Sequence, residues 1–169
     1  DIAFWPAATD FKYEDLKSYK RNELDITFFN GGIRTSENEE IAKLLREKTD
    51  LLVAYGSCAH QGGIPGLANM SDKSTVFDTV YRDNPSTYNP EGTVPLERSE
   101  FNGGELELPA LNERVRSLEG VVKVDYTVPG CPPPPELTQK FLDLMLSDDL
   151  PPRGSVVAGE KTVCDECNR

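Results

Sequence analysis

The stretch LLVAYGSC, residues 51–58, decides the fold, because an apolar run of strand formers stops there at a glycine and a cysteine. A strand that is nearly all apolar is typical of a parallel sheet covered on both faces. Two other runs have the same character, namely LDITFFN at residues 24–30 and VVKVDYTV at residues 121–128. The run DIAFWP at residues 1–6 predicts one more short strand.

Helical patterns separate these strands. The clearest helix has Ser36 as its predicted N-cap, with Glu39 three residues later as in a capping box, and it continues to Lys48. Further helices are predicted at residues 12–19, 72–82 and 110–118, and from Pro135 onward. Strands that alternate with helices indicate an α/β fold, a doubly wound parallel sheet with helices on both faces.

The segment between residues 72 and 108 has two parts. The helix predicted at residues 72–82 is expected to bury an apolar set, Val76, Phe77, Val80 and Tyr81. Residues 83–108 contain three prolines and three glycines and show no clear period. Because unstructured connections of this length are uncommon in compact domains, we expect a functional insert or an interface segment.

Three strand ends carry glycine, and two of them also carry a thiol. Cys58 follows Gly56 and Ser57, and Cys131 follows Gly130 at the end of another strand; Asn30-Gly31-Gly32 ends the third. Parallel sheets bind ligands at the carboxyl ends of their strands, so both thiols are predicted to lie at one edge. A glycine before each thiol lets the backbone approach something bulky.

The four cysteines leave several chemistries open. A chain of 169 residues does not need disulfides to be stable, so metal or redox chemistry is the stronger hypothesis. Cys58 and Cys131 alone are too few for a tetrahedral zinc site or a 4Fe-4S cluster. Cys164 and Cys167 have the C-x-x-C spacing of a zinc site, an iron–sulfur cluster or a redox dithiol. Two buried free thiols are the simplest alternative for the strand-end pair.

Charge and hydropathy exclude two classes of partner. The formal net charge is −11, and an acidic chain gains nothing from neutralising phosphates, so no nucleic-acid partner is expected. No apolar run has the length of a membrane span. The chain opens at Asp1 without methionine and ends in CDECNR, from which we expect it to be a piece of a longer protein.

Three motifs together resemble the small subunit of nickel–iron hydrogenases. They are FFNGGIRTSENEEIAKLLREK at residues 28–48, VAYGSCAHQGGIPGLAN at residues 53–69 and VDYTVPGCPPPPE at residues 124–136. The similarity is greatest to the methyl-viologen-reducing type that works with heterodisulfide reductase. The same elements occur in weaker form in the related 20 kDa subunit of respiratory complex I.

The resemblance implies a flavodoxin-like domain at residues 1–147 and the start of a C-terminal iron–sulfur segment at residues 148–169. In that family four cysteines hold a 4Fe-4S cluster, and two of these positions correspond to Cys58 and Cys131. Their neighbours Gly56, Ser57, Gly130 and Pro132 would line the cluster. Cys164 and Cys167 would be ligands of a second cluster.

The implied function is that of an electron-transfer subunit. It would relay electrons from the nickel–iron site of a large partner subunit, through 4Fe-4S clusters, to an iron–sulfur acceptor and heterodisulfide reductase. The expected location is the cytoplasm, without a membrane span. Two alternatives are a complex I-like 20 kDa iron–sulfur subunit and a zinc-bound structural or interaction domain.

Overall fold

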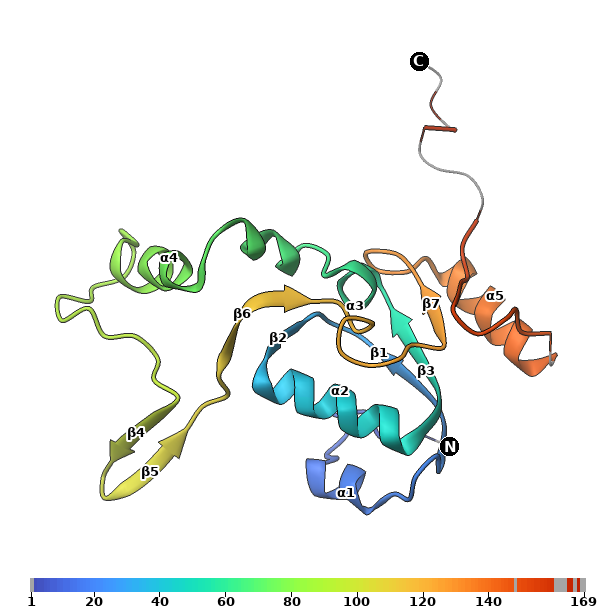
Figure 1. The fold of residues 1–169 in the computed structure, drawn as a ribbon, viewed down its shortest axis with the longest axis horizontal. Coiled ribbons are helices and arrows are strands. Elements are labelled where there is room, and N and C mark those ends of the chain that lie inside the picture. The colour runs from blue at the N-terminus through green and yellow to red at the C-terminus, as the bar shows by residue number, and fades with distance from the viewer. Residues whose placement is uncertain (1, 148, 160–163, 166, 168–169) are drawn as a thin grey trace.

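A computed structural model describes residues 2–147, 149–159, 164, 165 and 167 of the chain (Figure 1). The helices are α1 (Tyr13–Ser18), α2 (Ser36–Lys48), α3 (Ser57–Gln61), the 3₁₀ helix η1 (Pro65–Met70), α4 (Lys73–Phe77), the π-helical turn η2 (Asp78–Arg82) and α5 (Pro135–Leu146). The strands are β1 (Leu24–Phe29), β2 (Ile33–Thr35), β3 (Thr49–Tyr55), β4 (Arg98–Phe101), β5 (Gly104–Glu107), β6 (Leu111–Arg116), β7 (Tyr126–Val128) and β8 (Ser155–Val156).

A four-stranded parallel sheet is the centre of the molecule. Its order is β1-β3-β7-β8, and every neighbouring pair is parallel. This confirms the predicted parallel α/β sheet and its three main strands. Within the described residues the strand order follows the sequence without a reversal, so the predicted doubly wound order is not observed there. β8 belongs to this sheet, although it lies in the segment assigned from the sequence to a C-terminal extension.

Both faces of the sheet are covered, because alternate residues of each strand point to opposite sides. Leu52 and Ala54 of β3 belong to a core cluster that also contains Leu16 of α1 and Leu45 of α2. Val53, between them, belongs to a second cluster, which contains Phe141 of α5. Helices therefore lie on both faces, as the nearly continuous apolar character of β3 predicts.

The segment predicted as a helix at residues 110–118 is instead strand β6, so this prediction is wrong. β6 pairs antiparallel with β2, which joins Ile33 to Arg116 and Thr35 to Leu111. The side chain of Asn69 holds the last part of β6 in place, since it forms hydrogen bonds with both the N–H and the C=O of Val115, at 2.8 and 2.9 Å. Tertiary partners override the local helical pattern here.

Two strand predictions are corrected as well. Residues 2–6 form no strand; the Trp5 carbonyl accepts bonds from Ala8 and Thr9 and closes a turn. The run at residues 121–128 is a strand only at its end, over β7. Its first part forms turns, in which the N–H groups of Val121 and Val122 both donate to the Leu118 carbonyl at 3.0 Å.

Helix α2 exists as predicted, but it begins one residue earlier than its predicted cap implies. Thr35 is the N-cap, and its hydroxyl accepts a bond from Asn38 N–H at 3.2 Å while the Asn38 side chain accepts from Thr35 N–H. Ser36 instead accepts a bond from the N–H of Ala110. Glu39 pairs with Lys43 and Arg116, and these bonds lower the pKa of its carboxyl.

The helix predicted at residues 72–82 forms as α4 followed by η2, with Asp72 as the N-cap. Its four apolar side chains are not buried, which corrects the prediction; Val80 is 46% exposed and the other three are half-buried. Figure 1 shows why, because α4 and the β4–β5 hairpin extend away from the main sheet.

Candidate functional site

Cys58 lies at the carboxyl end of β3, in the first turn of the short helix α3. The first residues of the glycine-rich stretch after this cysteine fold into α3. Ala59 is fully buried and its carbonyl accepts a bond from Leu118 N–H at 2.8 Å, which fixes the helix. Cys58 is half-buried and carries a free thiol.

Cys131 lies at the carboxyl end of the neighbouring strand β7, and the backbone joins the two cysteine loops. Ser57 donates to the carbonyl of Gly130 twice, from its N–H at 2.7 Å and from its hydroxyl at 2.9 Å. Gly56 N–H donates to the Val128 carbonyl at 2.8 Å. Each cysteine follows a residue of the bonded Ser57–Gly130 pair, so the structure brings both loops to one edge of the sheet.

No residue with a side chain fits at the position of Gly130. Its φ is +141°, and an added Cβ would lie 2.4 Å from the Cα of Pro133 and 2.7 Å from the Pro132 carbonyl. The peptide between Cys131 and Pro132 is cis. Pro133 is buried, and α5 begins two residues later at Pro135, as predicted. The proline run thus connects an exposed Cys131 to a helix that is packed on the sheet.

Gly63 is a site residue that the sequence reasoning did not single out. An added Cβ at this position would lie 2.8 Å from the sulfur of Cys58 and 3.0 Å from its Cα and N. The backbone at Gly63, with a φ of +52°, therefore lies directly against the Cys58 side chain. The Gly-Gly pair at residues 62–63 is the only signal of this contact in the sequence.

The third glycine-ended strand also reaches this edge. An added Cβ at Gly32, beyond β1, would lie 3.6 Å from the Cys58 carbonyl oxygen. Nearby, the Arg34 guanidinium donates to the Glu113 carbonyl at 3.4 Å. The side-chain amide nitrogen of Gln61 lies 3.3 Å from Nδ1 of His60, to which it can donate a hydrogen bond. The ends of all three glycine-ended strands therefore lie at the edge that carries the two thiols.

The donor set at this edge consists of two thiols. All four cysteines are free, and no group of three or more metal-binding side chains occurs in the part of the chain that the structure describes. Two thiols at a backbone-lined edge fit half of the ligand set of a 4Fe-4S cluster, which takes four cysteines.

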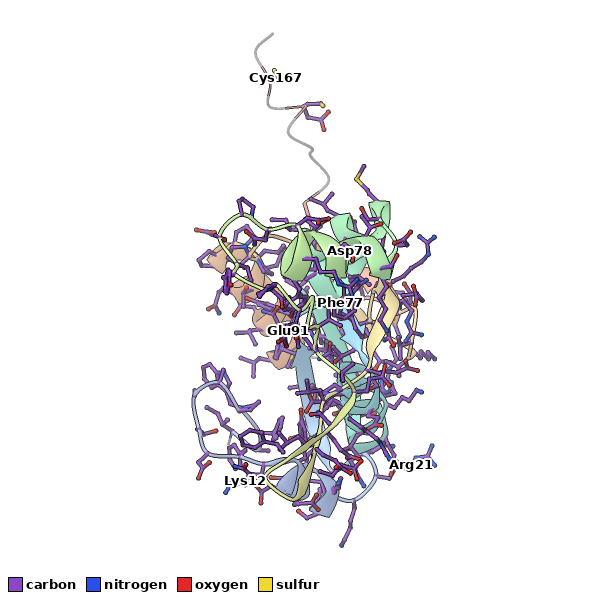
Figure 2. All side chains as sticks on the ribbon, turned by 90° about the vertical axis from the view of Figure 1, so that its left-hand side faces the viewer. Lys12, Arg21, Phe77, Asp78, Glu91 and Cys167 are labelled. Carbon is purple, nitrogen blue, oxygen red and sulfur yellow. The ribbon has the colours of Figure 1, made fainter. Side chains whose placement is uncertain are left out.

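The C-terminal cysteines are not brought to this edge. Cys164 and Cys167 are both exposed and share a turn in which Cys167 N–H donates to the Cys164 carbonyl at 3.3 Å. Figure 2 shows Cys167 on the terminal segment, beyond the folded part of the chain. Their predicted role as ligands of a separate cluster stays a prediction.

Among the described residues, no helix has the length and apolar character that crossing a membrane requires. This agrees with the hydropathy of the sequence.

Comparison with known families gives a match over most of the chain. The profile of the family described as NADH ubiquinone oxidoreductase, 20 Kd subunit, matches residues 3–145. This range contains β1, β3 and β7 and both strand-end cysteines.

Curated relatives match over the whole chain. The iron-sulfur subunit of the F420-non-reducing hydrogenase of Archaeoglobus profundus is 39% identical over 170 residues, which is 100% of this chain and 53% of the relative. A subunit of the F420-non-reducing hydrogenase of Methanothermobacter thermautotrophicus is 36% identical over 169 residues, 100% of this chain and 49% of the relative. The chain thus spans about half the length of these relatives.

A solved structure has the same fold. It is titled a crystal structure of NAD+-reducing [NiFe]-hydrogenase in the H2-reduced state, and a chain in it superposes with a TM-score of 0.65 at 32% identity. The match covers 75% of this chain and 66% of that one. The parallel four-stranded α/β architecture is therefore shared with a hydrogenase chain.

Proposed function

Because this chain belongs to the family of the 20 kDa subunit of NADH:ubiquinone oxidoreductase and is a homologue of subunits of F420-non-reducing hydrogenases, we propose that it is the electron-transfer subunit of a nickel–iron hydrogenase. The nickel–iron site would lie in a large partner subunit. The chain would act as part of an oxidoreductase without itself activating hydrogen.

One observation carries this proposal. Ser57 donates two hydrogen bonds to the Gly130 carbonyl, one from its N–H and one from its hydroxyl. These hydrogen bonds hold the loops of Cys58 and Cys131 together at the carboxyl edge of a parallel sheet. Two free thiols placed by neighbouring strand ends are suited to bind a shared metal cluster. A pair of unrelated buried thiols would not need the glycines that make this approach possible.

The residues around the thiols have distinct tasks in the proposed site. Cys58 and Cys131 would bind as thiolates, and Gly56, Gly130 and Pro132 would form the backbone wall beside them. Ser57 fixes the separation of the two loops through its bonds to Gly130. A rigid wall of this kind orients the ligands and limits the entry of water, which tunes the potential of a cluster.

The proposed cofactors are 4Fe-4S clusters, which supply one-electron transfer when bound. Cys58 and Cys131 would provide two ligands of one cluster, and its other ligands would come from outside these two loops. Cys164 and Cys167 would belong to a second cluster in a C-terminal segment that follows a flavodoxin-like domain. The resemblance to the hydrogenase small subunit supports two proposed electron acceptors, an iron–sulfur protein and heterodisulfide reductase. It also supports a location in the cytoplasm.

Two other functions make different predictions. A complex I-like subunit shares the family profile, but both curated relatives described above are hydrogenase subunits, and the C-x-x-C pair at residues 164–167 is not expected in the complex I subunit. A zinc-bound interaction domain would use the same thiols without electron transfer. It would give a colourless protein.

The deciding experiment is to isolate the complex without oxygen and to count iron and zinc in the sample whose visible and low-temperature EPR spectra are recorded. We expect broad brown absorbance, iron, and a reducible cluster signal. Zinc without iron, and no EPR signal after reduction, would show that the thiols serve structure.

Replacing one strand-end thiol tests the site itself. Cys131→Ser should remove the signal of the cluster at this edge and abolish hydrogen-driven dye reduction by the assembled complex. Cys164→Ser is the matched control, since it should leave that signal in place. Full activity of the Cys131→Ser complex would contradict the assignment.

A further inference from the structure

Residues 72–109, here called the arm, leave a large part of their apolar surface uncovered. The arm contains α4, η2 and the β4–β5 hairpin, and it extends away from the sheet (Figure 1). Figure 2 looks onto it and shows Phe77, Asp78 and Glu91 on the side that faces the viewer. Its most exposed apolar side chains are Tyr88, Leu96, Phe101, Leu106 and Leu108, each more than half exposed.

The hairpin has one apolar face and one charged face. Its register pairs Ser99 with Leu106 and Phe101 with Gly104, so Phe101, Leu106 and Leu108 lie on the same side. The alternate positions carry charge: Arg98, Glu100, Glu105 and Glu107. Such an amphipathic pattern specifies a register only when the apolar face is buried. All eight strand residues are nevertheless exposed here.

The hairpin is also poorly stabilised by its own contacts. Glu100 lies directly opposite Glu105, a like-charge pair that weakens the sheet. Arg98 offsets this in part, with contacts of 3.1 Å to Glu107 and 3.6 Å to Glu105. A two-stranded hairpin is marginally stable in water unless its apolar face packs on something. The described residues of this chain provide no cover for this apolar face.

A groove at the base of the hairpin is also lined largely by apolar side chains. It has a volume of ≈ 560 Å³ and lies between the helix of the arm and the segments that flank the hairpin. Val76, Phe77 and Val80 line one side, and Val94, Leu96 and Leu108 line the other. Phe77 and Tyr81 stack along the helix with ring centroids 5.8 Å apart.

The uncovered surface continues to the cysteine edge. Between Cys58 and the arm, η1 exposes Leu67 and Met70, at 63% and 86%, and Ile64 just before it is 69% exposed. Gly63, the next residue back, contacts Cys58. Exposed apolar side chains therefore occupy the segment of chain between the cysteine edge and the start of the arm. A subunit that covers the cysteine edge would lie beside these side chains of η1.

We propose that the arm is a docking surface for the partner subunit that covers the Cys58–Cys131 edge, an inference that rests on the proposed function. That subunit presents an apolar patch to Phe101, Leu106 and Leu108. The other face of the hairpin carries Glu100, Glu105 and Glu107 with one cation, Arg98. We therefore expect basic side chains where that subunit reaches past the edge of the hairpin. Apolar contacts at the centre and charged contacts at the rim are the usual anatomy of a subunit interface.

The test uses the full chain coexpressed with the hydrogenase large subunit from the same source. The double variant F101D/L106D should weaken association of the two subunits by about tenfold or more, because it places charge at the centre of the interface. Glu105→Lys should weaken it less, and the effect should shrink at high salt. Leu146→Asp on α5 is the control, since Leu146 is 86% exposed and lies outside the arm.

The outcomes separate the two proposals. If F101D/L106D binds the large subunit as tightly as the unchanged chain does, the arm is not the docking surface and the proposed function stands. If the unchanged chain neither binds the large subunit nor holds iron, the proposed function fails and the arm proposal fails with it. If the unchanged chain forms dimers that F101D/L106D abolishes, the arm joins two copies instead, and the proposal is overturned.

Discussion

At the scale of single residues, the contact between Gly63 and Cys58 shows how closely backbone and thiol fit together. A Cβ at Gly63 would meet the Cys58 sulfur at 2.8 Å, a separation that real Cβ atoms do not adopt. The neighbouring backbone cannot yield easily, because Cys58 Cα and N are nearly as close. A side chain at residue 63 would therefore displace the Cys58 thiol, which is a proposed ligand of the cluster.

We predict that Gly63→Ala lowers the iron content of the isolated complex and destabilises the chain by about 1–3 kcal/mol. Iron analysis and thermal melting measure the two effects. Gly66→Ala is the matched control for the same loop, since its added Cβ would meet nothing closer than 4.0 Å. Gly103→Ala controls for backbone strain alone, because Gly103 has a φ of +79° and open space. Equal iron in all three variants would contradict the role given to Gly63.

The sequence identifies some of these residues and misses others. Cys58 and Cys131 are recognisable because each follows a glycine at a strand end, a signal contained in a few adjacent letters. Gly63 is not recognisable as a contact of Cys58, because α3 is needed to fold the chain back by one turn. Glycine pairs occur in many loops, and only the folded backbone shows which one faces a sulfur.

At the scale of elements, the start of α2 depends on one hydroxyl. Thr35 accepts a bond from Asn38 N–H, and the Asn38 side chain accepts bonds from the N–H groups of Thr35 and Arg34. Thr35 is also the last residue of β2, so this reciprocal cap joins β2 directly to α2. The cap is therefore a junction between the two sheets.

We predict that Thr35→Ala lowers the free energy of unfolding by about 1 kcal/mol, the typical cost of losing an N-cap side chain. Thr35→Ser should retain most of the stability, since it keeps the hydroxyl. Urea denaturation followed by circular dichroism measures both. A Thr35→Ala chain as stable as Thr35→Ser would mean that the hydroxyl bond contributes nothing to α2.

The errors at this scale have physical causes. The spacing of apolar residues in β6 fits both a helix and a strand, and Asn69 and β2 decide between the two. The β4–β5 hairpin has a readable signal in the sequence, although no hairpin was predicted there. Asn102 and Gly103 both have positive φ, as a two-residue type I′ turn requires, and Asn-Gly is the usual sequence for it.

At the scale of the whole molecule, Asp125 joins parts of the chain that are far apart in sequence. This carboxylate is 1% exposed. It accepts bonds from Leu52 N–H at 2.9 Å, from Arg46 at 2.5 Å and from Arg153 at 3.0 Å. It therefore ties the entry of β7 to β3, to α2 and to the segment before β8. These contacts lie at the opposite end of β3 from Cys58.

The pKa of Asp125 is lowered in the folded chain. Burial by itself would raise this pKa, but the bonds from Leu52 and Arg46 and the charge of Arg153 together outweigh burial. A carboxyl with a lowered folded pKa stabilises the fold above its ordinary pKa of about 3.9. That contribution is lost as the pH falls through the lower folded value.

We predict that Asp125→Asn costs roughly 3 kcal/mol of stability at pH 7, because it leaves a partly buried Arg46 without its anion. The difference from the unchanged chain should stay constant down to about pH 5 and shrink below about pH 4. Chemical denaturation across this pH range measures it. Asp25→Asn, at an exposed position of β1, should have little effect at any pH. A difference that grows on acidification would contradict the assignment.

The sequence by itself determined the parallel sheet, its three main strands, helices α2 and α5, and the two thiols at strand ends. These features depend on local signals, namely apolar runs, caps and glycine stops, that act over a few residues. The tertiary structure alone decided the strand at β6, the Ser57–Gly130 bonds, the contact of Gly63 with Cys58, the Asp125 clamp and the exposure of the arm. Each of these features either joins groups that are distant in the chain or depends on which surface stays uncovered. The energies of such long-range contacts cannot be read from residues that are neighbours in the sequence.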